Sequence, residues 1–494
     1  MESKPKKHCW ECRRRCLVCD FTLPGCNRCR KDGVDCPGYG ASKPKRLRWV
    51  KPGEISSKTR KVKSTLQTSP TPKRMLSASM NELVPMVLQQ PPLMTDAKEL
   101  LDAVEYYNTQ IYLDMLPMEA LSTNPWLFPL SPSHVQRGIT RPDYVRFSLI
   151  GMTLGYRINQ TTDRNQQEFL AKSYCEYRGR VIQSLTRSIQ AQYNQPNDLI
   201  LAGIMALLLA DAQHGVSLNP RCHLEAIFRI ISLRGGVGKV LEAEHLDSFL
   251  TCFMFTAVFA NTSAPAHDLL MTETQVNGLQ DVIRQSNGQM FKFSACPLNL
   301  FSAIACTSNL RHRAAYFEAS SAETLYDEAM ANLRSIEQFS LVEWSASKPV
   351  CKPEWELLGI IYQSAAALYC ISSMQSLSVF PSTTRLNTHL DTLTSRLEEH
   401  LQTAFLSPRV DRFLFWPLMV LGVAAARGSD AMRISVAREL SRMSFRMGTC
   451  VPFITKGLLE KFWGSGETHW DACFNHPYVL TTQIAFDTSR LGHG

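Results

Sequence analysis

Residues 9–36 read CWECRRRCLVCDFTLPGCNRCRKDGVDC, and this stretch decides how the first part of the chain can fold. Two copies of the pattern C-x2-C-x6-C follow each other, and the second copy repeats the first at an offset of 17 residues. The segment holds too little apolar material for a hydrophobic core, so the repeated thiols predict a fold built around metal. The predicted ligands are Cys9, Cys12, Cys19, Cys26, Cys29 and Cys36.

The number of thiols sets the stoichiometry of the predicted cluster. Two tetrahedral zinc ions need eight ligand positions, and six thiolates fill them only if two thiolates bridge both ions. The duplication suggests one bridging thiolate in each half. We therefore expect two structural Zn²⁺ per chain, with no open coordination position for catalysis.

Cys16 is a seventh thiol and breaks the symmetry of the repeat. With Cys9, Cys12 and Cys19 it would offer four ligands to an iron–sulfur cluster, but the spacings and the following Asp20 differ from the ferredoxin pattern. A zinc ribbon that used Cys16 would have six residues between its cysteine pairs, well below the usual spacing of about 15–20. The six symmetric ligands fit better than either rival.

Positive charge is concentrated in the same part of the chain. Residues 1–63 hold 18 Lys/Arg and 6 Asp/Glu, whereas the remainder holds 35 and 38, within an overall net charge of +9. A local excess of this size, with no apolar face beside it, favours nucleic acid over membrane as a partner. A solvated basic tail is the alternative that charge alone leaves open.

The N-terminal sequence MESKPKKHCWEC has no apolar stretch of the kind that signal peptides need. The longest apolar runs, such as 200–210 and 249–260, fall short of the ~18 residues of a membrane span. We therefore expect an intracellular protein without a membrane partner, whose clustered cysteines bind metal.

Composition divides the chain into three regions. Residues 1–40 form the cysteine-rich module. Residues 41–95 are rich in Lys, Ser, Thr and Pro, which predicts a flexible basic linker without a zipper. The pattern of residues 96–494 predicts a large all-α domain. The fold class is thus mainly α. Apolar residues at helical spacing start at Leu100, and glycine after Arg234 should end one helix. Helices are further expected over 197–214, 246–260, 324–338, 354–376, 386–405, 412–427, 430–447 and 455–463, with loops near 128–143, 262–298 and 378–385.

The cysteine spacing, with Arg13-Arg14-Arg15 after the second ligand and Pro24-Gly25 in the connecting loop, resembles the DNA-binding domain of fungal Zn₂Cys₆ binuclear-cluster transcription factors. The resemblance implies that Cys9 and Cys26 bridge the two metals. It also implies that a short helix after Cys12 enters the major groove of double-stranded DNA, usually at a CGG triplet. The predicted DNA contacts are Arg13, Arg14, Arg15, Arg28, Lys43, Lys45, Arg46 and Arg48.

One position departs from that family. Lysine usually stands where this sequence has Cys16, and lysine or arginine on guanine O6 and N7 is the commonest specific contact, worth about 1–3 kcal/mol. The base triplet is therefore open. A thiol beside three arginines also raises an alternative function, a redox- or metal-responsive sensor with a depressed Cys16 pKa.

The rest of the chain is also similar to this family. His223-Leu224-Glu225, Phe415-Trp416-Pro417-Leu418 and Trp470-Asp471-Ala472-Cys473-Phe474 resemble its all-helical regulatory domain. The resemblance implies a nuclear, sequence-specific regulator of RNA polymerase II transcription that acts on a metabolic or secondary-metabolite pathway. It also implies partner co-regulators, and it leaves open whether the protein dimerises.

An enzyme tethered to DNA is a further alternative, but no motif of nucleophile, base and orienting residue occurs, so we predict no catalytic activity.

Overall fold

The structure is a computed structural model of the 494-residue chain, which divides into two compact units, Met1–Met86 and Val87–Gly494. The residues that the structure describes are 9, 11–12, 19–31, 33–34, 36–39, 92–121, 124–192, 197–215, 221–285, 294–316, 322–483, 486–488 and 491. Residues 41–91 of the predicted linker lie outside the described residues, so the limits of the linker stay a prediction.

The first unit is organised around buried cysteines; its described residues include the short helix α2 (Asn27–Lys31) and two helical residues at 11–12. Its buried residues are cysteines, and the partly buried Cys36 and Tyr39 pack against them. Because aliphatic side chains are absent from this cluster, sulfur takes the place of a hydrophobic core in the described part of the unit.

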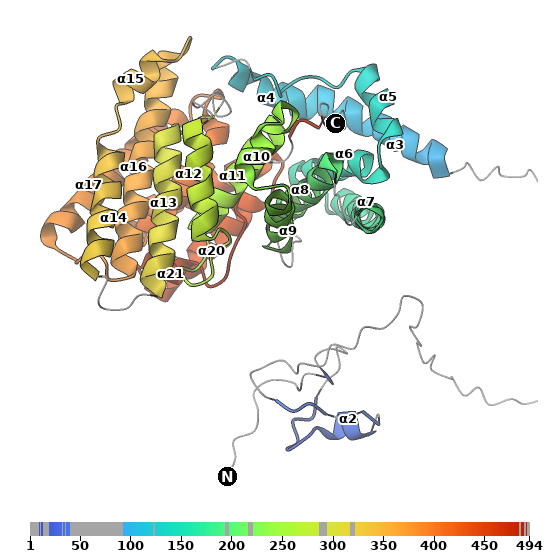
Figure 1. Ribbon diagram of the computed structural model, residues 1–494, viewed down its shortest axis with the longest axis horizontal. Coiled ribbons are helices and arrows are strands. Elements are labelled where there is room, and N and C mark those ends of the chain that lie inside the picture. Colours follow the sequence, from blue (N-terminus) through green and yellow to red (C-terminus); the bar gives the residue numbers. More distant parts are fainter. Residues whose placement is uncertain are drawn as a thin grey trace, which may run out of the picture. The chain divides into compact units, whose positions relative to one another are not determined.

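The second unit is built from helices, and no strand occurs in the described residues (Figure 1). The predicted mainly α fold class is confirmed. Its first half comprises α3 (Pro92–Tyr106), the π-helical turn η1 (Tyr107–Ile111), α4 (Tyr112–Glu119), α5 (Pro132–Thr140), α6 (Asp143–Gln160), α7 (Arg164–Ala191), α8 (Asp198–His214), α9 (Arg221–Leu233), α10 (Val237–Leu241), η2 (Glu244–Leu246) and α11 (Asp247–Thr262). Its second half comprises α12 (Glu273–Gln285), α13 (Leu298–Ala315), α14 (Ala322–Glu337), α15 (Leu341–Ala346), α16 (Lys352–Ser376), α17 (Thr384–Ala404), η5 (Asp411–Phe413), α18 (Phe415–Ala424), α19 (Asp430–Met447), α20 (Val451–Ser465) and α21 (Trp470–Cys473).

Two groups of helices make up this unit. Helices α6, α7 and α8 pack on one another in the first group, and α16 packs against α13, α14, α15, α17 and α18 in the second. Packing of α19 on α6 and of α20 on α8 joins the C-terminal helices to the first group. Figure 1 shows α11 between the two groups, where its almost wholly buried surface explains its apolar sequence.

Helix α16 is long and apolar enough to cross a membrane by length and composition alone, unlike the shorter apolar runs noted in the sequence. However, 78% of its 18-residue apolar window is buried inside the protein. A helix that is apolar all round is expected at the centre of a large helical bundle, and this is the position that α16 occupies among its neighbours.

The predicted glycine stop after Arg234 is confirmed. Gly235 and Gly236 have φ of 93° and 91°, a region that L side chains rarely adopt. The amide of Gly236 donates to the carbonyl of Ile231 at 3.0 Å, and that of Gly235 to the carbonyl of Ser232 at 3.1 Å. These two bonds form a Schellman motif and satisfy carbonyls that the end of α9 would leave unpaired.

The predicted loops near 128–143 and 262–298 are wrong in part. Helix α5 lies within the first and α12 within the second, and both carry a narrow apolar stripe on an otherwise polar sequence. The sequence reading also missed α6, α7 and α13. In α7 the buried Leu170, Tyr174, Tyr177, Val181 and Leu185 do recur at helical spacing, but polar residues fill its other faces, because it packs by one side only.

The C-terminal aromatic segment packs into the core. The indole nitrogen of Trp470 donates to the carbonyl of Thr262 at 3.0 Å, and the Asp471 carboxylate accepts from Arg311 at 2.8 Å. Arg311 is fully buried on α13 and also donates to the Tyr369 hydroxyl of α16 at 3.2 Å. This network ties α11, α13, α16 and α21 together through one buried cation.

Candidate metal centre and nucleic-acid interface

The structure brings all six predicted ligands together. The sulfur atoms form two groups of four, and within each group all sulfurs lie within 4.8 Å of one another. The groups share Cys9 and Cys26, the two positions that correspond in the sequence repeat. One group adds Cys12 and Cys19, and the other adds Cys29 and Cys36.

The spacing of the sulfurs fits thiolates that share a metal. Cys9 Sγ lies 3.5 Å from Cys26 Sγ and 3.7 Å from Cys29 Sγ, and Cys12 Sγ lies 3.6 Å from Cys26 Sγ. Tetrahedral zinc with bonds of about 2.3 Å to sulfur places its ligands about 3.8 Å apart. A disulfide would need sulfurs about 2.05 Å apart, so these contacts are not disulfides.

Backbone amides point at the sulfurs in the same way in both halves. The amide of Cys12 donates to Cys9 Sγ at 3.4 Å, and the amide of Cys29 donates to Cys26 Sγ at 3.3 Å. Each bond spans three residues, and the two bonds are related by the 17-residue repeat. Donors of this kind stabilise negative charge on sulfur and orient it, as outer-shell groups do around metal ligands.

The repeat extends to backbone conformation, which the sequence reading missed. Phe21 has φ of 58°, and Gly38, the residue 17 positions later, has φ of 78°. Glycine adopts this left-handed region freely, but a phenylalanine there is strained. Aligning the two halves by their cysteines pairs Phe21 with Gly38, so the sequence did contain a signal for this turn.

The surroundings of the six cysteines alter the pKa values of their thiols. Burial raises the pKa of the Cys9 and Cys12 thiols and raises that of Cys29 to about 12. At Cys19 burial acts in the same direction but is outweighed by the backbone amides of Cys9 and Phe21, so that its pKa falls to about 6. Several of these thiols would stay protonated at neutral pH without a cation, and clustered thiolates are the ligands that Zn²⁺ prefers.

Residues around the cluster fix its shape. The Asp20 carboxylate accepts from the Thr22 hydroxyl at 2.7 Å and from the amide of Asn27 at 3.1 Å, which places an anion at the start of α2. The Thr22 hydroxyl bond lowers the pKa of Asp20. Tyr39 donates to the carbonyl of Thr22 at 2.9 Å and lies 3.6 Å from Cys19 Sγ, so the segment after the last cysteine closes over the cluster.

Close packing favours glycine at position 25. A Cβ added at Gly25 would lie 3.1 Å from the Cβ of Cys36, tighter than ordinary side-chain contacts. The connecting loop therefore passes directly against a predicted ligand, which gives a physical reason for glycine in the Pro24-Gly25 sequence.

Of the predicted DNA contacts, Arg28 is the one that lies among the described residues. Arg28 is exposed on α2. The remaining predicted contacts and Cys16 lie outside the described residues, so their roles stay predictions. These residues are Arg13, Arg14, Arg15, Lys43, Lys45, Arg46 and Arg48.

Comparison with known proteins identifies the class. Residues 103–477 match the family model described as the fungal specific transcription factor domain. The chain belongs to this family of fungal transcription factors. It is 34% identical over 498 residues to the phomenoic acid biosynthesis cluster-specific transcriptional regulator of Leptosphaeria maculans, covering 99% of this chain and 92% of that protein.

A second relative is matched over a short stretch only. Arginine metabolism regulation protein II of Saccharomyces cerevisiae is 36% identical over 74 residues, which are 15% of this chain and 8% of that protein. No solved structure matches. Both relatives are regulators by name, so the predicted function class, a fungal transcription regulator, is supported, and the alternative of a DNA-tethered enzyme gains nothing from these comparisons.

Proposed function

We propose that this chain holds two Zn²⁺ ions on six thiolates, binds double-stranded DNA through that cluster in the nucleus, and regulates RNA polymerase II transcription. Cys9 and Cys26 are the bridging ligands, and Cys12, Cys19, Cys29 and Cys36 are the terminal ones. The zinc ions would fold the module and take no part in catalysis. We assign no catalytic activity to the helical unit.

One observation carries the proposal: two groups of four sulfurs share the two cysteines that are equivalent in the repeat. Six ligands can complete two tetrahedra only by sharing two members. An iron–sulfur cluster on the first four cysteines would leave Cys26, Cys29 and Cys36 without a reason to approach Cys9.

The DNA contacts come from the arginines that flank the cluster and from the basic run at Lys43, Lys45, Arg46 and Arg48. Six thiolates and two Zn²⁺ leave a net charge of −2 on the cluster itself, which the surrounding arginines and lysines exceed. The target would be CGG-type half-sites, with Arg13, Arg14 and Arg15 replacing the lysine that is absent at Cys16. Regulation of a biosynthetic gene cluster is supported by the name of the Leptosphaeria relative.

The test uses the full chain purified with zinc. We expect two zinc ions per chain by elemental analysis and tighter binding to CGG-containing duplexes than to scrambled ones in gel shifts. Cys26→Ser should lose zinc and specific DNA binding together. Cys175→Ser, at an exposed thiol on α7, is the matched control and should retain both. One zinc per chain, or zinc loss without loss of specific DNA binding, would refute the proposal.

Cys16 gives a sharper test of the assigned ligands. Cys16→Lys should keep two zinc ions and should raise affinity for CGG sites by about 1–3 kcal/mol through a new contact to guanine. Cys16→Ser should change zinc content and affinity little. Redox-dependent DNA binding that Cys16→Ser abolishes would favour the sensor function instead.

A further inference from the structure

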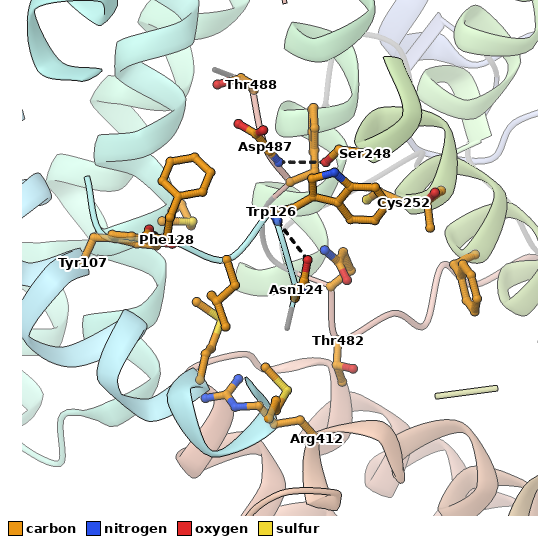
Figure 2. Close-up of a pocket in the computed structure, with 18 of the residues that line it drawn as sticks. Tyr107, Asn124, Trp126, Phe128, Ser248, Cys252, Arg412, Thr482, Asp487 and Thr488 are labelled. Atoms are coloured by element: carbon orange, nitrogen blue, oxygen red, sulfur yellow. Dashed lines mark hydrogen bonds between the residues drawn. The ribbon is translucent and has the colours of Figure 1, made fainter. Parts of the chain in front are cut away.

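The helical unit contains a cavity of about 470 Å³ that the DNA-binding function does not use. Its walls include parts of α3, α5, α6 and α11, the loop 124–130 and the C-terminal segment 480–488. Figure 2 shows Arg412 at one end of the cavity, Asp487 at the other, and Trp126 between them. The volume lies within the range of about 300–1,000 Å³ that is typical of small-molecule sites.

One face of the central helix α11 opens on this cavity. Within residues 248–262 every residue of α11 is buried except Thr251, Phe255 and Phe259, which recur every four residues along one face. All three line the cavity. Two phenylalanines that keep accessible surface on a helix that is otherwise buried leave apolar area for another molecule to cover.

A second aromatic wall is positioned by the π-helical turn η1. Asn108 bonds both backbone groups of Leu130, donating to its carbonyl at 2.9 Å and accepting from its amide at 2.7 Å. The Tyr107 hydroxyl donates to the carbonyl of Phe128 at 3.4 Å. These bonds hold the loop that carries Trp126 and Phe128 beside the cavity, and such π turns are common at functional sites.

Polar groups of the wall have partners within the protein. Figure 2 shows two such bonds: the amide of Asp487 donates to the Ser248 hydroxyl at 3.0 Å, and the amide of Trp126 donates to the Asn124 side chain at 2.9 Å. A hydrogen-bonding ligand would have to compete with these bonds, so they add little to its affinity.

Two of the lining arginines are neutralised by aspartates behind the wall. Arg412 pairs with Asp114, and Arg146 pairs with Asp143 at 2.7 Å. Both arginines are largely buried, with side chains 8% and 12% exposed. Neither pair therefore presents a net charge to a ligand.

The other ionisable groups of the wall also balance. Burial lowers the pKa of Arg141, and the negative charge of Asp487 acts in the opposite direction, so these two opposite charges lie near each other. Arg137 and Glu119 have opposite charges as well. Burial lowers the pKa of His134, which leaves its ring neutral at pH 7. A charged ligand would lose its hydration here without an excess of opposite charge to replace it.

We propose that this cavity binds an uncharged, mostly apolar small molecule, whose hydrocarbon surface covers Leu149, Phe255 and Phe259. Burial of apolar surface would supply most of the binding free energy. The helical unit would then be a receptor for a small molecule. This site involves none of the metal ligands, so its occupancy can be measured whether or not zinc and DNA bind as proposed.

The experiment titrates the full chain with Nile red, an uncharged fluorescent dye, and displaces it at pH 7 with decan-1-ol, decanoate or decylammonium. The three competitors share a hydrocarbon chain and differ in the charge of the head group. We expect saturable 1:1 dye binding, and displacement by the alcohol at concentrations about tenfold or more below those needed of either ion. Displacement by either ion at the same concentration as the alcohol would overturn the proposal.

Two variants locate the site. Leu149→Trp enlarges a half-buried lining residue of α6 and should weaken dye binding by about tenfold or more. Val145→Phe, one turn earlier on the same helix, fills less space and should weaken it by about threefold. Leu101→Trp, at a leucine of α3 that is 56% exposed, is the matched control and should bind like the unaltered chain. Circular dichroism identifies the variants that fold. Unaltered dye affinity in a folded Leu149→Trp or Val145→Phe variant would overturn the proposal.

Discussion

The two units of this chain solve the problem of folding in opposite ways. In the cysteine module the buried residues are thiols that form two groups able to hold a metal ion, so we expect the fold to depend on a cation. In the helical unit the core is aliphatic and aromatic and runs from α3 to the C-terminal segment. A short duplicated segment can be ordered by a few strong bonds, whereas a long segment needs a large buried area.

The largest expected effect comes from removing metal. A strong zinc chelator should unfold the cysteine module, because structural zinc contributes about 10–16 kcal/mol to the folding of such small domains. The helical unit should keep its unfolding temperature. Calorimetry of the full chain with and without chelator, together with proteolysis of the cysteine module, measures both. A fall in the unfolding temperature of the helical unit would show that its stability also depends on zinc.

The second prediction concerns Cys9 and Cys26, the cysteines that belong to both sulfur groups. Cys9→Ser removes a member of both sulfur groups, whereas Cys36→Ser removes a member of one. We therefore expect the first variant to lose both zinc ions and the second to keep a larger share of them. Equal zinc content in the two variants would contradict the assignment of Cys9 as a bridge.

The next effect lies in the helical core. Arg311→Ala should destabilise the helical unit by about 3–5 kcal/mol, because it leaves the Asp471 carboxylate with its buried partner gone. Arg313→Ala, two residues away in a half-exposed pair with Glu328, is the control and should cost about 1 kcal/mol or less. Thermal unfolding measures both, and zinc content should be unchanged in each variant. Equal losses in the two variants would contradict the role of burial.

A smaller effect should appear in acid. Burial raises the pKa of Asp211, but Arg178 at 2.5 Å and His223 outweigh it, so the pKa lies below the usual value of about 3.9. The stabilisation is complete above that value and is lost as the pH falls through the lower, folded-state pKa.

Asp211→Asn should therefore lower the unfolding temperature of the helical unit at pH 7 and flatten its decline below about pH 4. Glu168→Gln, in an exposed pair with Arg164 on α7, is the control and should leave the profile as it is. A profile that Asp211→Asn leaves unaltered would show that the buried pair does not set the acid response.

The smallest effect compares the two halves of the cysteine module. Phe21→Gly should stabilise the metal-bound module by about 1 kcal/mol, since glycine relieves the left-handed strain. Gly38→Ala should destabilise it by about 1–2 kcal/mol at the equivalent position. Zinc competition against a chelator would register the first change as about a fivefold rise in affinity. A fall in affinity for Phe21→Gly would mean that contacts of the phenylalanine outweigh its strain.

The features that depend on local chemistry could be predicted from the amino-acid sequence. Cysteine spacing at an offset of 17 indicated which thiols would share a site, and the glycine stop after Arg234 and the apolar stripe from Leu100 marked parts of helices correctly. These signals are local because metal geometry, caps and helical periodicity each depend on neighbours within a few residues.

Tertiary structure decided what depends on packing between distant segments. Helix α7 escaped sequence reading because only one of its faces is buried. The buried pair of Arg311 and Asp471 escaped because its two residues lie on α13 and α21, which are far apart in the chain. No local pattern encodes such a pair, since burial and the loss of water arise only when the helices assemble.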